Sequence, residues 1–130
     1  MQICHNHIMT WNIEVTDQFR DWYDNLDVVD SDAVTEAVNL LERQGPTLKR
    51  PLVGEVQSSQ HKNMKELRVM VKEIRILFAF DPRRTGLLLI GGDKTGDWDR
   101  WYEGAIPVAD ALYDAHLREI APEKKGRKKA

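Results

Sequence analysis

Basic side chains in the second half of the chain have the types and spacing to hold a phosphate group. Two runs of alternating polar and apolar residues are typical of strands, and they place Arg68 and Arg75 on the polar side of neighbouring strands. Lys94 follows at the end of a third apolar run. Because arginine offers a planar fork to two phosphate oxygens and lysine a point charge, they would form a cationic triangle suited to a phosphodiester. The same pattern also fits ordinary cross-strand ion pairs of these arginines with Glu66 and Glu73.

Aromatic and histidine side chains add two further possibilities. Trp98, Trp101 and Tyr102 come shortly after the third apolar run, and they fit either stacking on nucleobases or coverage of the sheet edge. The hydroxyl of Tyr102 is also available for chemistry. His61 and His116 are the histidines best placed to titrate near neutral pH, although a histidine on a terminal helix is more often a surface residue.

Gly91–Gly96, with the sequence GGDKTG, has the composition of a phosphate-binding loop but not its spacing. Such a loop needs GxxxxGK[ST] between a strand and a helix. Here Lys94 comes before the last glycine, Gly96, and no Lys-Ser/Thr pair follows Gly96. We therefore expect a strand end that presents Lys94, with the glycines allowing the chain to turn into the aromatic segment. Cys4, His5 and His7 lack a second Cys/His group at zinc-ligand spacing, so we expect no metal site and no cofactor.

The elements that must position these side chains follow from hydrophobic periodicity and capping signals. Thr16 is the predicted cap of a first helix, and Asp30 or Ser31 that of a second helix, which stops at Pro46. Pro107 fits the first position of a terminal helix. The predicted order is a strand at 11–15, helices with apolar stripes at 19–26 and 34–41, a polar connector at 47–65, strands at 66–72, 74–80 and 87–92, and a helix at 108–120. This predicts a small α+β fold with an antiparallel-rich sheet, an N-terminal helical hairpin and a C-terminal helix, with the helices on one face.

Length and composition fit one domain. The chain has 130 residues, of which 42% are hydrophobic, enough for a single core. We expect the domain to span residues 10–121, with a flexible extension at 1–9 and a disordered basic tail at 122–130. The single cysteine cannot form an internal disulfide, and no apolar run reaches the length of a membrane span, so we expect a cytoplasmic protein.

The net charge of −2 conceals a strong asymmetry along the chain. Between Glu14 and Glu42 there are nine acidic residues and one basic residue, whereas between Arg43 and Arg84 there are ten basic and four acidic residues. An acidic first third beside a basic middle predicts two faces with different partners, and a polyanion would bind the basic one. Solvated faces without partners are the alternative.

The stretches KELR, IRILFAFDP and GGDKTG, followed by WYE and IP, carry a resemblance to a known family. From Trp11 to Ile120 the chain resembles the RelE/HigB-type toxins of bacterial type II toxin–antitoxin systems, in the branch related to phage-derived proteins. The resemblance implies a RelE-like fold. It also implies a metal-independent endoribonuclease that cleaves mRNA on the ribosome until a cognate antitoxin protein neutralises it.

The resemblance implies roles for particular residues as well. The expected catalytic residues are Arg68, Arg75, Lys94 and Tyr102. The expected RNA-binding residues are Lys65, Lys72, His61 and Trp101. Glu66 stands where RelE has a second strand lysine, so the proton donor and acceptor stay open among His61, Lys65 and Tyr102.

Two other functions are compatible with the same fold. ParE-type toxins share it and bind DNA gyrase without acting as nucleases, and a fold does not determine function. An inactive prophage-type interaction module is the second alternative. Growth arrest without RNA cleavage would favour the first, and harmless expression without an antitoxin would favour the second.

Overall fold

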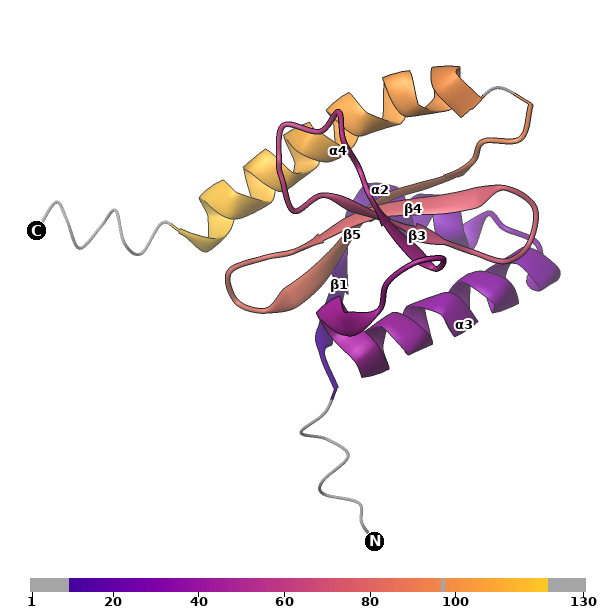
Figure 1. The fold of residues 1–130 in the computed structure, drawn as a ribbon, viewed down its shortest axis with the longest axis horizontal. Helices are drawn as coiled ribbons and strands as arrows, with labels where there is room; N and C mark the ends of the chain where they lie inside the picture. The colour runs from indigo at the N-terminus through magenta and orange to yellow at the C-terminus, as the bar shows by residue number, and fades with distance from the viewer. Residues whose placement is uncertain (1–9, 97, 122–130) are drawn as a thin grey trace, which may run out of the picture.

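The computed structural model describes residues 10–96 and 98–121. Within these residues the elements are β1 (Asn12–Val15), α2 (Asp17–Asp24), α3 (Val28–Gln44), a short 3₁₀ turn η1 (Gly45–Thr47), β2 (Val53–Glu55), β3 (Lys65–Arg68), β4 (Ile74–Phe80), β5 (Thr85–Asp93) and α4 (Trp98–Ile120) (Figure 1). The expected extension and basic tail, with Cys4, His5 and His7, lie outside the described residues. No described helix is both long enough and apolar enough to cross a membrane.

The strands form one five-stranded sheet in the order β1-β5-β4-β3-β2. Only β1 pairs in parallel, with β5, and the other neighbours are antiparallel. The predicted antiparallel-rich α+β fold is therefore confirmed. The prediction missed β2, which lies inside the expected connector, because a three-residue strand in a polar segment has no detectable alternation.

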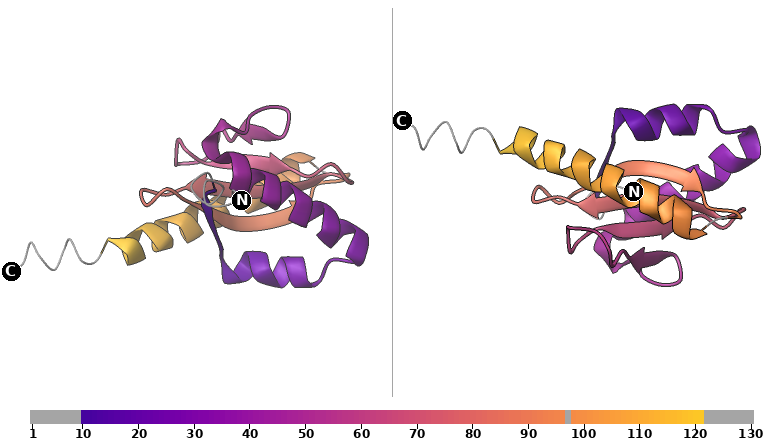
Figure 2. Two further views of the ribbon diagram at one scale, coloured as in Figure 1. Left: turned by 90° about the horizontal axis from the view of Figure 1, so that it is seen from below. Right: turned by 90° about the horizontal axis from the view of Figure 1, so that it is seen from above.

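Helices cover both faces of the sheet, so the expectation that they share one face was wrong. Phe19 of α2 and Val34 of α3 pack in one core cluster with Ile76 of β4, whereas Ala109 of α4 packs in a second cluster with Leu77. Figure 1 shows α4 along one side of the sheet and α3 along the other. In Figure 2, α3 lies in front of the sheet in the left view and α4 in the right view. The reason is visible in β4 and β5, whose nearly continuous apolar residues are buried on both faces.

The boundaries of several elements differ from those predicted. Thr16 caps α2 as expected, accepting a hydrogen bond from the N–H of Phe19 at 3.0 Å. The cap of α3 is Asp27, which lies before both predicted candidates. The helix α4 begins at Trp98, and Pro107 lies inside it rather than at its start. The strand β3 ends at Arg68, because the chain then turns towards β4 through Lys72, whose φ of 53° belongs to the left-handed region.

Candidate functional site

The candidate site lies on the face of the sheet that α4 covers, beside the N-terminal half of that helix. Arg68 of β3 and Arg75 of β4 are direct cross-strand partners, and Gly92 of β5 is the partner of Arg75. Two arginines directly opposite each other repel, so this register needs a carboxylate nearby.

Glu66 supplies that carboxylate. It is buried, and its Oε2 lies 3.1 Å from Nη2 of Arg68 and 4.0 Å from Nε of Arg75. Its other oxygen, Oε1, accepts a hydrogen bond of 2.6 Å from the hydroxyl of Tyr102 in α4. One buried carboxylate thus joins three of the four residues expected to be catalytic.

Glu73 completes the arrangement at the start of β4. Its Oε1 lies 3.6 Å from Nη2 of Arg75 and 3.2 Å from Nζ of Lys94. The Lys94 side chain is only 2% exposed, whereas that of Glu73 is 39% exposed. Contrary to the prediction, Lys94 is therefore not presented to solvent. Its backbone N–H donates to the carbonyl of Glu73 at 3.1 Å, which draws the residue inward.

The site is thus a charge network of Arg68, Arg75, Lys94, Glu66 and Glu73, with Tyr102 bonded to it. Both alternatives raised by the sequence hold together: the cations do gather, and each is paired with a carboxylate. An anion that binds to these cations must compete with the carboxylates already present.

Tyr102 remains protonated over the whole physiological range. Its burial and its hydrogen bond to Glu66 raise the pKa of its hydroxyl to about 12, because both oppose the anionic form. A neutral phenol can donate a proton or a hydrogen bond. The ring of Trp101 lies edge-on to that of Tyr102, with 5.0 Å between ring centroids, and fixes its position.

Gly91 and Gly92 explain why glycines precede Lys94. A Cβ at Gly91 would lie 2.3 Å from the indole of Trp22, and one at Gly92 would lie 2.3 Å from the indole of Trp101. Both glycines are inside β5 and let a tryptophan pack directly against each face of the strand. The prediction that they make a turn was wrong; the glycine with left-handed backbone is Gly96, at φ 89°.

Of the predicted RNA-binding residues, the side chains of Lys72, His61 and Lys65 point away from the network, whereas Trp101 packs beside it. Lys72 binds Asp30 of α3 at 2.7 Å. His61 binds Asp114 at 2.7 Å, and Asp114 lies about 18 Å further along α4 than Tyr102 at a rise of 1.5 Å per residue. Lys65 faces away from Glu66 by strand alternation, towards a hollow beside η1. Trp101 is half-buried against Gly92, and the side chain of Trp98 lies outside the described residues.

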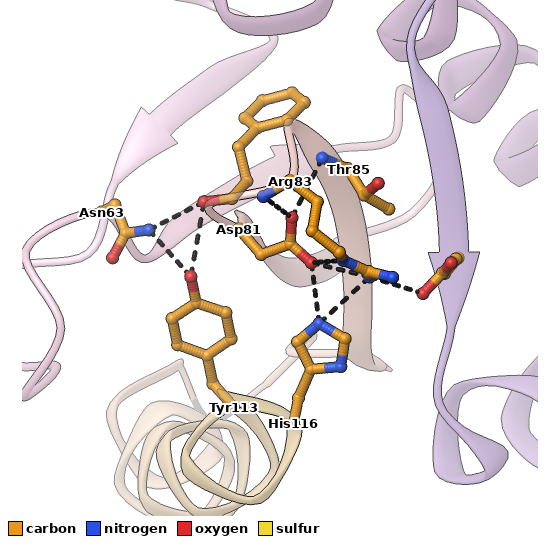
Figure 3. A network of polar contacts seen from close by, with 8 residues as sticks. Asn63, Asp81, Arg83, Thr85, Tyr113 and His116 are labelled. Carbon is orange, nitrogen blue, oxygen red and sulfur yellow. Dashed lines mark hydrogen bonds and ion pairs between the residues drawn. The ribbon is translucent and has the colours of Figure 1, made fainter. Parts of the chain in front are cut away.

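A second polar cluster lies at the opposite end of the sheet, where β4 turns into β5 (Figure 3). The buried carboxylate of Asp81 accepts hydrogen bonds from the backbone N–H groups of Arg83 and Thr85 at 2.8 and 3.1 Å. It also lies 2.7 Å from Nη2 of Arg83 and 2.8 Å from Nε2 of His116 in α4. The cluster thus ties the hairpin turn to the C-terminal half of α4, and His116 has a structural partner rather than a surface position.

Sequence reasoning missed the central role of Glu66. The available signal was its position two residues before Arg68, on the same face of a strand, but the sequence could not show that α4 closes over it. Among the described residues, no three His, Cys, Asp or Glu side chains are grouped so as to hold a metal ion.

Comparison with solved structures defines the class of fold. The RelE–RelB complex of Pyrococcus horikoshii OT3 matches with a TM-score of 0.53 and 13% identity, over 68% of this chain and 99% of that chain. A mutant of Escherichia coli RelE in the free state matches with a TM-score of 0.55 and 5% identity, over 72% and 93%. At these identities the match establishes a RelE-type fold.

Sequence comparison then gives the family. Residues 21–114 match the family model described as phage derived protein Gp49-like, and the chain belongs to that family. A Mycobacterium tuberculosis relative bearing the toxin name HigB3 is 53% identical over 72% of this chain and 82% of its own. A second, bearing the name HigB2, is 41% identical over 92% of this chain but only 60% of its own length. The expected resemblance to RelE/HigB-type toxins is confirmed.

Proposed function

We propose that this chain is the toxin of a type II toxin–antitoxin pair and that it cleaves mRNA on the ribosome. The observation that carries the proposal is the charge network, in which two paired arginines, a buried carboxylate and a neutral tyrosine meet. Support comes from the HigB toxin names of its relatives and from the RelE fold. When RNA is cleaved by its own 2′-hydroxyl, the protein must transfer protons and stabilise the added negative charge.

The proposed reaction uses only the side chains of the network. The 2′-oxygen attacks the adjacent phosphorus while the bond from phosphorus to the 5′-oxygen breaks, leaving a 2′,3′-cyclic phosphate and a 5′-hydroxyl. Arg68 and Arg75 hold the non-bridging oxygens and stabilise the added negative charge. Glu66 accepts the proton of the 2′-hydroxyl, and Tyr102 gives its proton to the departing 5′-oxygen. The hydrogen bond of 2.6 Å between Tyr102 and Glu66 then returns the proton to the phenol.

Glu73 occupies the place where a phosphate would enter. It is the more exposed of the two carboxylates in the network and contacts both Arg75 and Lys94. A bound phosphate would displace it and take over these two cations. Lys94 then contributes its charge from a buried position, where it is only weakly screened.

An antitoxin is the second partner in this proposal. A hollow of about 360 Å³ between α2 and α3 is lined by apolar side chains that include Phe19, Val34 and Val38. It lies over the sheet face opposite the charge network, and the segment around it is the acidic third of the chain. This surface fits an apolar antitoxin segment with basic flanks. A Val38→Asp toxin would then arrest growth even when the cognate antitoxin is co-expressed, whereas full neutralisation of this variant would contradict the placement.

The test of the nuclease is primer extension on mRNA bound to purified ribosomes. We expect cuts in A-site codons with the wild-type protein, and about 10²-fold or greater losses with Arg75→Ala, Glu66→Gln and Tyr102→Phe. Arg84→Gln is the matched control, since it removes a cation that packs on Trp11 at the far end of the sheet. Intact mRNA with a folded, growth-arresting protein would refute the nuclease.

One observation favours a second candidate, a toxin that binds DNA gyrase without cutting RNA. Every cation of the network already has a carboxylate partner, and Lys94 is almost wholly buried. Gyrase inhibition in a supercoiling assay, with intact mRNA on the ribosome, would favour this candidate.

A further inference from the structure

The segment between β2 and β3 is anchored along α4. The Ser59 hydroxyl donates to Asp110 at 2.5 Å, and the backbone N–H of Gln60 donates to the same carboxylate at 3.0 Å. The ring of His61 lies 2.7 Å from Asp114 and packs edge-on against Tyr113. Figure 1 shows this segment rising to α4. These contacts fix a loop that its polar sequence alone would leave mobile.

The fixed loop and α4 enclose two adjoining hollows, of about 410 and 330 Å³. Both are lined by Ser58, Tyr102 and Ile106, and the smaller one also reaches Glu66. The hollows therefore begin at the proposed reaction centre and run along α4 away from it. The hydroxyl side of Tyr102 faces the charge network through its bond to Glu66, so one side chain borders both regions.

The lining of these hollows is rich in hydrogen-bond acceptors. Carboxylates of Glu55 and Glu103 and the amide of Gln57 line them, and none of the described lining residues is Lys or Arg. Such a surface repels phosphate and favours a neutral group that carries N–H donors.

We propose that these hollows form the base-recognition subsite for the nucleotide at the scissile phosphate. This rests on the proposed nuclease function. With the phosphate on Arg68 and Arg75, the base lies against Tyr102 and Ile106, between α4 and the fixed loop. Single-stranded RNA is recognised in this way, by contact with base faces and hydrogen bonds to base edges. Because acceptors line the subsite, it selects a base with an exocyclic amino group, which offers two N–H donors (adenine, cytosine or guanine), over uracil, whose base edge offers one, N3–H.

The experiment compares cleavage of ribosome-bound mRNAs that differ only in the base at the cut site. We expect the wild-type protein to cut at the amino-bearing bases at least about tenfold faster than at uracil, since one base contact supplies discrimination of that order. Glu103→Lys places a cation in the subsite, and we expect it to reduce this preference to about threefold or less. Glu119→Lys is the matched control, with the same charge change in the same helix about 24 Å further on.

The outcomes separate this inference from the proposed function. Cleavage by the wild-type protein that does not depend on the base overturns the subsite and leaves the nuclease standing. An unchanged preference in Glu103→Lys, with the wild type selective, also overturns it. If no mRNA is cut at all, the nuclease fails and the subsite fails with it. A preference that Glu103→Lys relaxes and Glu119→Lys retains supports the subsite.

Discussion

Two histidine–carboxylate contacts that involve α4 provide a test of how burial controls the contribution of an ion pair to the free energy of unfolding. Asp81 lies 2.8 Å from His116 and Asp114 lies 2.7 Å from His61, so the contacts are nearly equal in length. Their surroundings differ: the Asp81 side chain is 0% exposed, whereas that of Asp114 is 43% exposed. We predict very different losses of stability when each is changed to asparagine.

The expected magnitudes follow from the partners that each change leaves behind. Asp81→Asn presents an NH₂ group to a cluster of donors. It leaves His116 and the backbone N–H groups of Arg83 and Thr85 poorly paired in a buried site, whereas the Arg83 guanidinium keeps Glu14, and we expect a cost of about 3–5 kcal/mol. Asp114→Asn affects a partly exposed contact that water can replace, with an expected cost of about 0–1 kcal/mol. A domain of this size is stable by about 5–15 kcal/mol, so both variants can be measured in the folded state.

The assay is equilibrium unfolding in urea, followed by tryptophan fluorescence at pH 7. Acid provides a second measurement on Asp81. Burial alone would raise the pKa of this carboxyl, but hydrogen bonds from His116, Arg83 and the backbone outweigh it and lower the pKa below its usual value. Since the pKa is lower in the folded state, the stability it contributes is present above the unfolded pKa of about 3.9 and is lost as the pH falls through the folded value. The difference between wild type and Asp81→Asn should therefore shrink below about pH 4.

Equal costs for the two asparagine variants would refute the argument, because they would mean that burial and the extra donors at Asp81 add nothing to the histidine contact. A difference between wild type and Asp81→Asn that grows in acid would refute the sign of the pKa shift. Unchanged slopes of the urea transitions would confirm that the comparison concerns the folded state.

Three further predictions concern the glycines and the charge network. Gly104 lies in open space on α4, so Gly104→Ala should raise the free energy of unfolding by about 0.5–1 kcal/mol, whereas Gly92→Ala should lower it by about 1–3 kcal/mol because the new methyl group displaces Trp101. Equal effects of the two changes on urea unfolding would contradict this. Tyr102→Phe should slow RNA cleavage without altering the shape of its pH profile between about pH 6 and 9, because the phenol has a pKa of about 12; a lost alkaline limb would show that the phenol titrates there. Glu73→Gln should tighten the binding of single-stranded RNA and steepen its salt dependence, because Glu73 competes with the RNA phosphate for Arg75 and Lys94; fluorescence anisotropy measures both. Weaker binding would mean that Glu73 orients these cations instead.

Much of the site's location could be predicted from strand alternation. Arg68 and Arg75 share one face of β3 and β4, as their spacing indicated. The position of Tyr102 beside them came from family resemblance, because no periodicity links a helix residue to a particular strand. The burial of Lys94 could not be predicted, since it depends on a backbone hydrogen bond to Glu73, 21 residues earlier in the chain.

The missed boundaries have local physical causes. Pro107 suggested a helix start because proline is favoured at the first helical position, yet the helical pattern of Trp101 and Ala105 extends through it and loses only one hydrogen bond. Asp27, Asp30 and Ser31 are all residues that can cap a helix, and only the tertiary position of α3 selects the first. Competing local signals of similar strength are decided by packing.

The two carboxylates of the network have different access, and this difference bears on how a phosphate would enter. Glu66 is buried between Arg68, Arg75 and Tyr102, so its removal would take from Arg68 its carboxylate partner and leave Glu73 alone to offset the repulsion between two directly paired arginines. Glu73 is partly exposed at the start of β4 and can leave the network without such a cost. An incoming phosphate would therefore exchange with Glu73 and not with Glu66. The arginines would then stay aligned, and Glu66 would stay in contact with Tyr102 during the proposed proton transfers.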